Sequence, residues 1–227
     1  SGRSAPLPAK RRGFRRVDAA ARRAGLLSNT PGLVTMHMGA GKGGLEPVFY
    51  ALDHSDLPAR NLLPTHMGRS RELINQGVEL VRRGGYMDVT AGCDPAEVEA
   101  MADMIEYALG KDGVTIDHIS LSSDGYGSQP RFNELGECVG LTYASPKSLH
   151  ETVKCLARRG RDLTEVLRLV TATPADILGK VGVKGCVAQG ADADLLVLGE
   201  NLAIDGLFAR GRTALWQGEV LMKGKFE

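Results

Sequence analysis

Several features that would assign a function class are missing from this 227-residue sequence. Its 4 cysteines are widely scattered and form no Cys-x-x-Cys pair, which argues against a disulfide framework and against a thiolate zinc site. No apolar stretch is long enough to cross a bilayer, and no signal-peptide hydrophobic region opens the chain. We therefore expect a cytoplasmic protein that has no membrane partner.

An excess of charge of one sign is also lacking. The sequence has 28 lysines and arginines against 27 aspartates and glutamates, a formal net charge of +1. No global field therefore suggests a nucleic acid or an acidic membrane surface as a partner. Residues 1–30 are the exception, because basic residues dominate there. Such a bias is typical of a solvated basic helix face, and also of a basic arm or a transit peptide.

Two common catalytic and phosphate-binding motifs are absent as well. No serine nucleophile elbow is visible. The glycine-rich run at residues 39–44 lacks the spacing of a P-loop and its terminal Lys-Ser/Thr, so we interpret it as a mobile loop. Candidate chemistry must therefore come from other side chains.

Short apolar runs alternate with helix-like segments over most of the chain. The runs cover residues 32–38, 61–67, 86–91 and 118–123, and the helical patterns between them cover 45–52, 69–83 and 95–109. Strands separated by helices predict parallel β/α units. Four such units are half of an eight-stranded (β/α) barrel, and half a barrel would leave two strand edges open.

The later part of the sequence changes character. Helical patterns at 149–157 and 163–169 precede a short helix that Thr173 could cap. Short strands are then predicted at 193–198, 206–210 and 213–223, with turns at 211–212 and 217–218. The predicted organisation is a basic segment (1–30), a (β/α) barrel portion (31–180) and a small β-structure (181–227).

Three polar side chains stand at or just after the ends of apolar runs. They are His37, His66 and Asp124. The carboxyl ends of parallel barrel strands face one rim, so these groups can converge although they are distant in sequence. Two histidines and a carboxylate suit a zinc ion with open coordination positions. Each residue could instead be a hydrogen-bonded core or rim residue.

Two further side chains lie next to these candidates. Arg69 stands three residues after His66, where it could contact the carboxylate of an acidic or peptide-like substrate or form a surface salt bridge. Ser128 follows Asp124 in the next loop and could donate a hydrogen bond. Both are candidate substrate-binding residues.

Other polar residues favour structural roles. His54 lies in a turn-like stretch, and His118 opens a strand at the end that serves stability in a barrel, so neither should bind metal. Asp192 and Asp194 enter a strand from a turn, which favours a structural role over acid–base work.

Taken together, these segments resemble the amidohydrolase superfamily and, within it, the isoaspartyl dipeptidases. The likeness is carried by His-Met-Gly at 37–39, by Leu-Pro-Thr-His at 63–66 with Arg69, and most specifically by Leu-Ser-Ser-Asp-Gly-Tyr-Gly-Ser-Gln-Pro at 121–130. The segments 171–178 and 190–197 resemble the general superfamily ending. The resemblance implies an α/β fold, the C-terminal half of a metal-dependent (β/α)8 TIM-type barrel plus part of a small flanking β-sandwich.

The resemblance also implies an activity and a site. The expected activity is hydrolysis of β-aspartyl (isoaspartyl) dipeptides by a metal-activated hydroxide at a binuclear zinc centre. His37 and His66 would bind one ion, and Asp124 would bind the other and handle the proton. Arg69 and Ser128 would contact substrate, and Arg3 would do so from a segment that resembles the family's arginine-containing loop.

The sequence departs from the family pattern near its start. Residues 1–30 contain no histidine, and the family's first His-x-His pair and its bridging lysine have no counterpart. We therefore expect at most a partial zinc site, little dipeptidase activity from this chain alone, and either a homo-oligomer or pairing with a missing N-terminal half. Two alternatives stay open. One is an amidohydrolase acting on a cyclic amide or an N-acyl amino acid, and the other is a non-catalytic remnant that binds a partner through its barrel edges.

Overall fold

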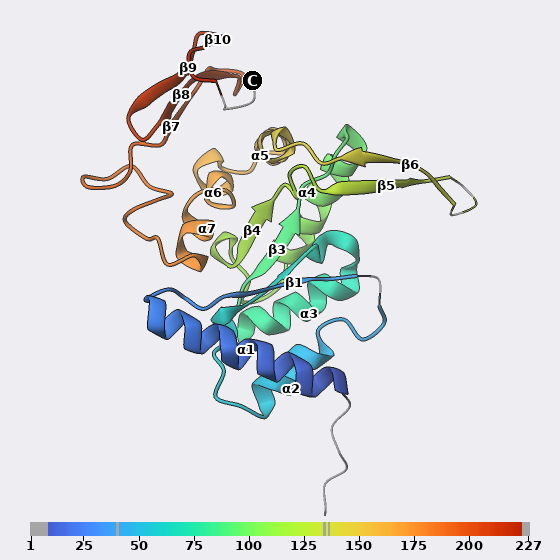
Figure 1. The fold of residues 1–227 in the computed structure, drawn as a ribbon. Helices are drawn as coiled ribbons and strands as arrows, with labels where there is room; N and C mark the ends of the chain where they lie inside the picture. The colour runs from blue at the N-terminus through green and yellow to red at the C-terminus, as the bar shows by residue number, and fades with distance from the viewer. Residues whose placement is uncertain (1–8, 40, 134, 136, 224–227) are drawn as a thin grey trace, which may run out of the picture. The chain divides into compact units, whose positions relative to one another are not determined.

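Parallel strands connected by helices build the first of two units, Ser1–Gly179 and Lys180–Glu227. The computed structural model describes residues 9–39, 41–133, 135 and 137–223 (Figure 1). The first unit contains, in chain order, α1 (Ala9–Ser28), β1 (Val34–His37), α2 (Glu46–Asp53), η1 (Ala59–Asn61), β2 (Leu62–Thr65), η2 (Met67–Arg69), α3 (Arg71–Arg82), β3 (Met87–Thr90), α4 (Pro95–Leu109), η3 (Ile116–His118), β4 (Ile119–Ser122), β5 (Ser128–Phe132), β6 (Cys138–Tyr143), α5 (Lys147–Arg158), α6 (Leu163–Arg168) and α7 (Ala172–Ile177).

The strands of the first unit pair as the β/α pattern predicts. β1 pairs with β2 and β3 pairs with β4, both in parallel. Backbone pairing does not continue from β2 to β3 in the described part of the chain, so the four strands form two parallel pairs. A side-chain hydrogen bond joins the pairs instead, because Thr65 Oγ1 donates to Asp88 Oδ2 at 2.5 Å.

The β3–β4 pair has one apolar face and one polar face, because successive side chains of a strand point to opposite sides. Its apolar residues belong to the hydrophobic core that α3 and α4 also build: Met87, Val89, Ile119 and Leu121. Its polar residues lie in register on the other face: Asp88 opposite Ser120, and Thr90 opposite Ser122. The predicted start of α4 is confirmed, since the Asp94 side chain accepts a hydrogen bond from the Glu97 amide.

The described part of the basic N-terminal stretch contains α1, and most of the described side chains of α1 are exposed. It approaches the following chain closely at Gly25, where a Cβ would lie 2.6 Å from the backbone of Gly32. In the part of the chain that the structure describes, no helix has both the length and the apolarity needed to span a bilayer.

Two local predictions need correction. The sequence pattern did not predict the antiparallel β5–β6 hairpin, in which Val139, Leu141 and Tyr143 alternate along β6 and are all exposed. This alternation is a strand signal, but it is short and contains Gly140. Thr173 does not cap a helix, because it lies inside α7, and its buried hydroxyl donates to the Ile116 carbonyl at 3.4 Å.

The second unit is a four-stranded antiparallel sheet in the order β10-β9-β8-β7. Its strands are β7 (Leu195–Leu198), β8 (Ile204–Ala209), β9 (Arg212–Trp216) and β10 (Glu219–Val220). The predicted turn at Gln217–Gly218 is confirmed, with φ of 48° and 84°. The other turn lies one residue earlier than predicted, at Arg210–Gly211, since these residues have φ of 49° and 76°. Two-residue hairpin turns favour this left-handed backbone.

Candidate metal centre

The structure brings His37 and His66 together. His37 ends β1 and is exposed, whereas His66 follows β2 and is 9 % exposed. Parallel pairing sets His37 opposite Thr65, the residue before His66. The Nδ1 atom of His37 lies 3.0 Å from the Nε2 atom of His66. Two ring nitrogens from different strands therefore converge at the carboxyl ends of β1 and β2.

The backbone at two of the predicted ligands is unusual. His66 has φ of 62° and Asp124 has φ of 49°, both in the left-handed region that residues other than glycine seldom adopt. Such outliers persist where the surrounding structure enforces them, and they concentrate at functional sites. Turn residues such as Arg210 and Gln217 share this conformation, so it agrees with a functional role of His66 and Asp124 without selecting them.

The surroundings of His66 favour its neutral form. Burial lowers the pKa of His66 most, and the positive charge of Arg69 lowers it further. The carboxylates of Asp124 and Asp88 oppose these effects and raise it. The net direction is downward, and a neutral imidazole is the form that binds metal ions.

The second ring nitrogen of His66 contacts a hydroxyl that the sequence interpretation missed. Its Nδ1 atom lies 2.7 Å from Thr90 Oγ1, on β3. Thr90 in turn lies 3.5 Å from Ser122 Oγ on β4. A sequence signal was present, because polar residues alternate with apolar ones in both strands.

Asp88 is the buried acceptor of this polar face. It is 4 % exposed, and its carboxylate accepts hydrogen bonds from Thr65, Ser120 and Ser122 at 2.5–2.6 Å. Burial raises the pKa of Asp88, and the three hydroxyl donors oppose that rise. Buried carboxylates need such donors to offset the loss of water.

The histidine pair fits a zinc ion as two of its ligands. Two ligands of a tetrahedral ion with zinc–nitrogen bonds of about 2.0–2.1 Å lie roughly 3.3 Å apart, close to the separation seen here. Within residues 9–39, 41–133, 135 and 137–223, no group of three His, Cys, Asp or Glu side chains is arranged to hold an ion. The pair therefore fits part of a metal centre, and the role of Asp124 as a ligand stays a prediction.

Arg69, Ser128 and Arg3 are the residues that we predicted to bind substrate, and the structure describes only the first two. Arg69 Nη1 donates to the carbonyl of Met38 at 2.6 Å, so this side chain reaches back across the site to the residue after His37. Ser128 is exposed at the start of β5. Arg3 lies outside the described residues.

The residues to which we assigned structural roles make local contacts. His54 Nδ1 lies 2.9 Å from the Tyr50 carbonyl, and His118 Nδ1 accepts a hydrogen bond from the Thr115 amide at 3.1 Å. Asp192 and Asp194 both pair with Lys184.

A cavity of about 220 Å³ adjoins His66. It is lined by His66, Gly68, Arg69, Thr90, Ala91, Gly92, Cys93, Glu97 and Met101. It therefore offers a cation and a carboxylate beside His66, above apolar side chains. This volume suits a small group rather than a drug-sized ligand.

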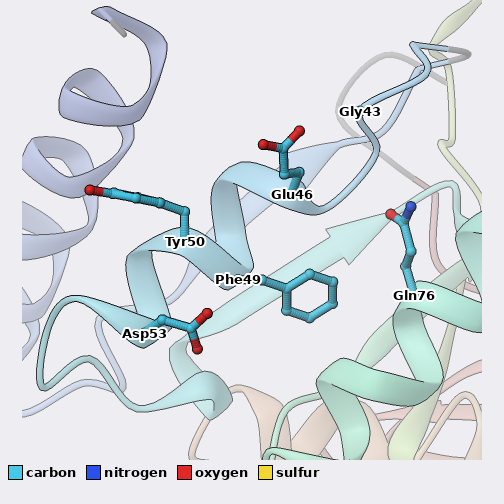
Figure 2. A pocket seen from close by; sticks show the side chains of 6 residues that line it. All are labelled: Gly43, Glu46, Phe49, Tyr50, Asp53 and Gln76. Carbon is cyan, nitrogen blue, oxygen red and sulfur yellow. The ribbon is translucent and has the colours of Figure 1, made fainter. Parts of the chain in front are cut away.

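A larger cavity of about 300 Å³ lies on another side of this unit, between α2 and α3. Figure 2 shows its lining, which includes Glu46, Phe49 and Asp53 from α2 and Gln76 from α3. Arg83 pairs with Asp53 and lies 5.0 Å above the Phe49 ring, so that carboxylate has a structural partner. Its lining includes no histidine. The volume of a cavity therefore does not by itself identify the candidate metal centre.

Comparisons with known proteins agree on the family. A β-aspartyl dipeptidase from Fervidobacterium islandicum AW-1, solved in complex with a β-Asp-Leu dipeptide, is 32 % identical with a TM-score of 0.83, over 98 % of this chain and 56 % of that chain. Another structure of a β-aspartyl dipeptidase from this bacterium is 29 % identical with a TM-score of 0.79, over 97 % and 55 %. This chain thus spans about half the length of these proteins.

More distant structures share the fold alone. An adenosine deaminase from Xanthomonas campestris, solved with bound zinc, is 17 % identical with a TM-score of 0.52, over 92 % of this chain and 51 % of that chain. The sequence profile of the amidohydrolase family matches residues 97–214. Since this match covers more than half of the 227 residues, the chain belongs to the amidohydrolase family.

Proposed function

We propose that this chain is part of a zinc-dependent hydrolase that cleaves β-aspartyl dipeptides. The observation that carries the proposal is the similarity to a β-aspartyl dipeptidase along 98 % of this chain. The approach of His37 to His66 supports it, because both histidines were expected to be ligands of such a centre. The proposed architecture is the C-terminal half of a (β/α)8 TIM-type barrel with part of a flanking β-sandwich, divided at residues 30 and 180.

The proposed roles follow from the chemistry of each side chain. His37 and His66 would hold one zinc ion, and Asp124 would bind the other ion of a binuclear centre. A bound zinc ion would supply Lewis-acid chemistry by polarising the scissile carbonyl and lowering the pKa of water. The Asp124 carboxylate would take the proton of the attacking water and deliver it to the leaving amine.

Two side chains would bind the substrate. The guanidinium of Arg69 suits a substrate carboxylate because its planar donors can bind both carboxylate oxygens, and its donation to the Met38 carbonyl holds it near His37. Ser128 would donate a hydrogen bond from the start of β5. Arg3 is a further candidate for substrate contact.

The site of this chain would be partial. The histidine pair offers two ligands, and the described residues offer no three-ligand group. We therefore propose that the 227-residue chain binds zinc weakly, has little activity alone, and works either as a homo-oligomer or with a second polypeptide that completes the centre.

Zinc titration by calorimetry tests the site. We expect weak binding to the full chain and no measurable binding after His37→Ala or His66→Ala. His54→Ala is the matched control, since this exposed histidine lies in a turn after α2, and it should leave binding unchanged. Equal zinc affinity in all four proteins would exclude the histidine pair as the site.

A substrate panel tests the reaction. The zinc-loaded chain is offered β-Asp-Leu, a cyclic amide and an N-acyl amino acid. Slow turnover of the β-aspartyl dipeptide supports the proposal, whereas preference for another amide replaces its substrate. Rapid hydrolysis would overturn the partial-site expectation, and no turnover of any substrate, even after a complementing polypeptide is added, would overturn the enzymatic function.

A further inference from the structure

A line of hydroxyl groups connects His66 with Asp88. Ser122 Oγ donates to Asp88 Oδ2 at 2.6 Å. Ser122 Oγ also lies 3.5 Å from Thr90 Oγ1, which lies 2.7 Å from Nδ1 of His66. Asp88 is 4 % exposed and His66 is 9 % exposed, so solvent has little access to either end.

The ionised carboxylate of Asp88 decides which atom donates the proton in each hydrogen bond between Asp88 and His66. An ionised carboxylate only accepts hydrogen bonds, so Ser122 must direct its one proton at Asp88. The Ser122 oxygen then offers a lone pair to Thr90. If Thr90 directs its proton at Ser122, its own oxygen can only accept from His66, and Nδ1 must carry the imidazole proton.

The opposite arrangement is less favourable. If Thr90 donated to a bare Nδ1 atom, the oxygen of Ser122 would lose the hydrogen bond that Thr90 otherwise donates to it. His66 would then carry its proton on Nε2, the atom that faces His37 Nδ1. That proton would occupy the position where a metal ion would bind.

We propose that Asp88 is a positioning residue that acts through Ser122 and Thr90 to hold His66 as the Nδ1–H tautomer, with the Nε2 lone pair directed at His37. The importance of this tautomer for metal binding rests on the proposed function. The tautomer itself is a property of the metal-free chain.

The fold supplies this arrangement through strand register. Thr90 lies directly opposite Ser122, and Asp88 lies directly opposite Ser120 on the same face. Thr65 and Ser120 donate to the same carboxylate from either side of β3. These two further donors stabilise the ionised state on which the proton direction depends.

Nitrogen-15 NMR of the metal-free full chain tests the inference directly. The ring-nitrogen shifts of His66, identified by their absence from a His66→Gln spectrum, report which nitrogen carries the proton above the titration range of imidazole. We expect mostly Nδ1–H in the wild type. Ser122→Ala removes the acceptor of Thr90, and Thr90→Val removes the partner of Nδ1, so both should increase the Nε2–H fraction.

Two further variants separate this role from a merely structural one. Thr90→Ser keeps the hydroxyl and should keep the wild-type tautomer. Thr152→Val removes another buried hydroxyl, one that donates to the Ser148 carbonyl within α5, and should change nothing at His66. Wild-type tautomer populations in Ser122→Ala would overturn the inference, and so would a wild-type His66 that is mostly Nε2–H. If Thr90→Val does not fold, Ser122→Ala still decides the result.

Zinc affinity provides a second measurement. Loss of the group that orients a metal-binding histidine lowers metal affinity by about 10- to 100-fold, so Thr90→Val should weaken zinc binding by roughly 10-fold and Thr90→Ser should restore it. A wild-type chain with the expected tautomer but no zinc binding would refute the proposed function and leave the inference intact. Zinc binding that is indifferent to Thr90→Val would refute the role in metal binding.

Discussion

Two buried aspartates, Asp88 in β3 and Asp18 in α1, have opposite surroundings. Asp88 is 4 % exposed and accepts three hydroxyl hydrogen bonds. Asp18 is fully buried, and neither of its oxygens has a hydrogen-bond partner among the described residues. Burial raises the pKa of both carboxyl groups, and the positive charge of Arg22 opposes this rise at Asp18.

The hydrogen bonds to Asp88 make it part of an organised polar site, whereas Asp18 is a buried charge that no hydrogen bond stabilises among the described residues. A buried carboxylate with donors orders the groups around it, whereas one without donors mainly loses its hydration. Asp88 lies next to the candidate metal centre, and Asp18 lies on a helix whose described residues are mostly exposed. In this protein, a buried carboxylate therefore points to a functional site only where hydrogen-bond donors surround it.

The largest effect should come from Asp88→Ala. This change leaves the hydroxyls of Thr65, Ser120 and Ser122 without their acceptor, and we expect a loss of about 3 kcal/mol in the free energy of unfolding. Urea denaturation measures it. Asp88→Asn keeps one carbonyl acceptor and should lose only about 1 kcal/mol. A loss below about 1 kcal/mol in Asp88→Ala would mean that these hydroxyls do not depend on the carboxylate.

Asp18→Ala should have the opposite sign. Removing a buried carboxylate that has no hydrogen-bond partner among the described residues, and gaining a better helix former, should raise the free energy of unfolding by about 1 kcal/mol. The same denaturation experiment measures the change. Destabilisation would show that Asp18 has a favourable partner, which would remove the contrast with Asp88.

Asp88 and Asp18 should make the free energy of unfolding change with pH in the same direction. Each native pKa is raised, so the folded chain binds protons more readily than the unfolded chain between the ordinary carboxyl pKa and the raised one. The free energy of unfolding of the wild type, relative to Asp88→Asn or Asp18→Asn, should therefore fall as pH rises through this window. A rise over the same window, in denaturation series at several pH values, would contradict these pKa directions.

The smallest stability effect should come from His37→Ala. His37 is exposed at the end of β1, so we expect a change within about 0.5 kcal/mol, although zinc binding should be lost. Met36→Ala is the matched control on the opposite face of β1, where the side chain packs against the core, and it should cost about 1 kcal/mol. A large loss of stability in His37→Ala would mean that this histidine is structural.

Regular elements were the most predictable part of the fold. The run from Pro95 to Leu109 carries an N-cap, an initial proline and helical periodicity, and α4 has these bounds. The β5–β6 hairpin was not predicted because the alternation along β6 is short, and its Val139, Leu141 and Tyr143 are exposed, so no buried face of β6 strengthens the pattern. The helix start near Thr173 was wrong by two residues because Thr171 occupies the N-cap position.

The candidate site was predictable only in part. His37 and His66 could be paired from sequence, because strand ends in parallel β/α units share a rim. The hydroxyls of Thr90 and Ser122 could not be assigned a partner, since their relation to His66 depends on the register between β3 and β4.

The amino-acid sequence by itself determined the β/α alternation, the family and the two histidines, because periodicity and short motifs are local properties of a chain. Only the tertiary structure decided that, among the described residues, β1–β2 and β3–β4 form separate parallel pairs, that Asp88 accepts from three hydroxyls, and that Asp18 has no hydrogen-bond partner. The physical reason is that hydrogen bonding and desolvation of a buried group depend on neighbours that are distant in sequence.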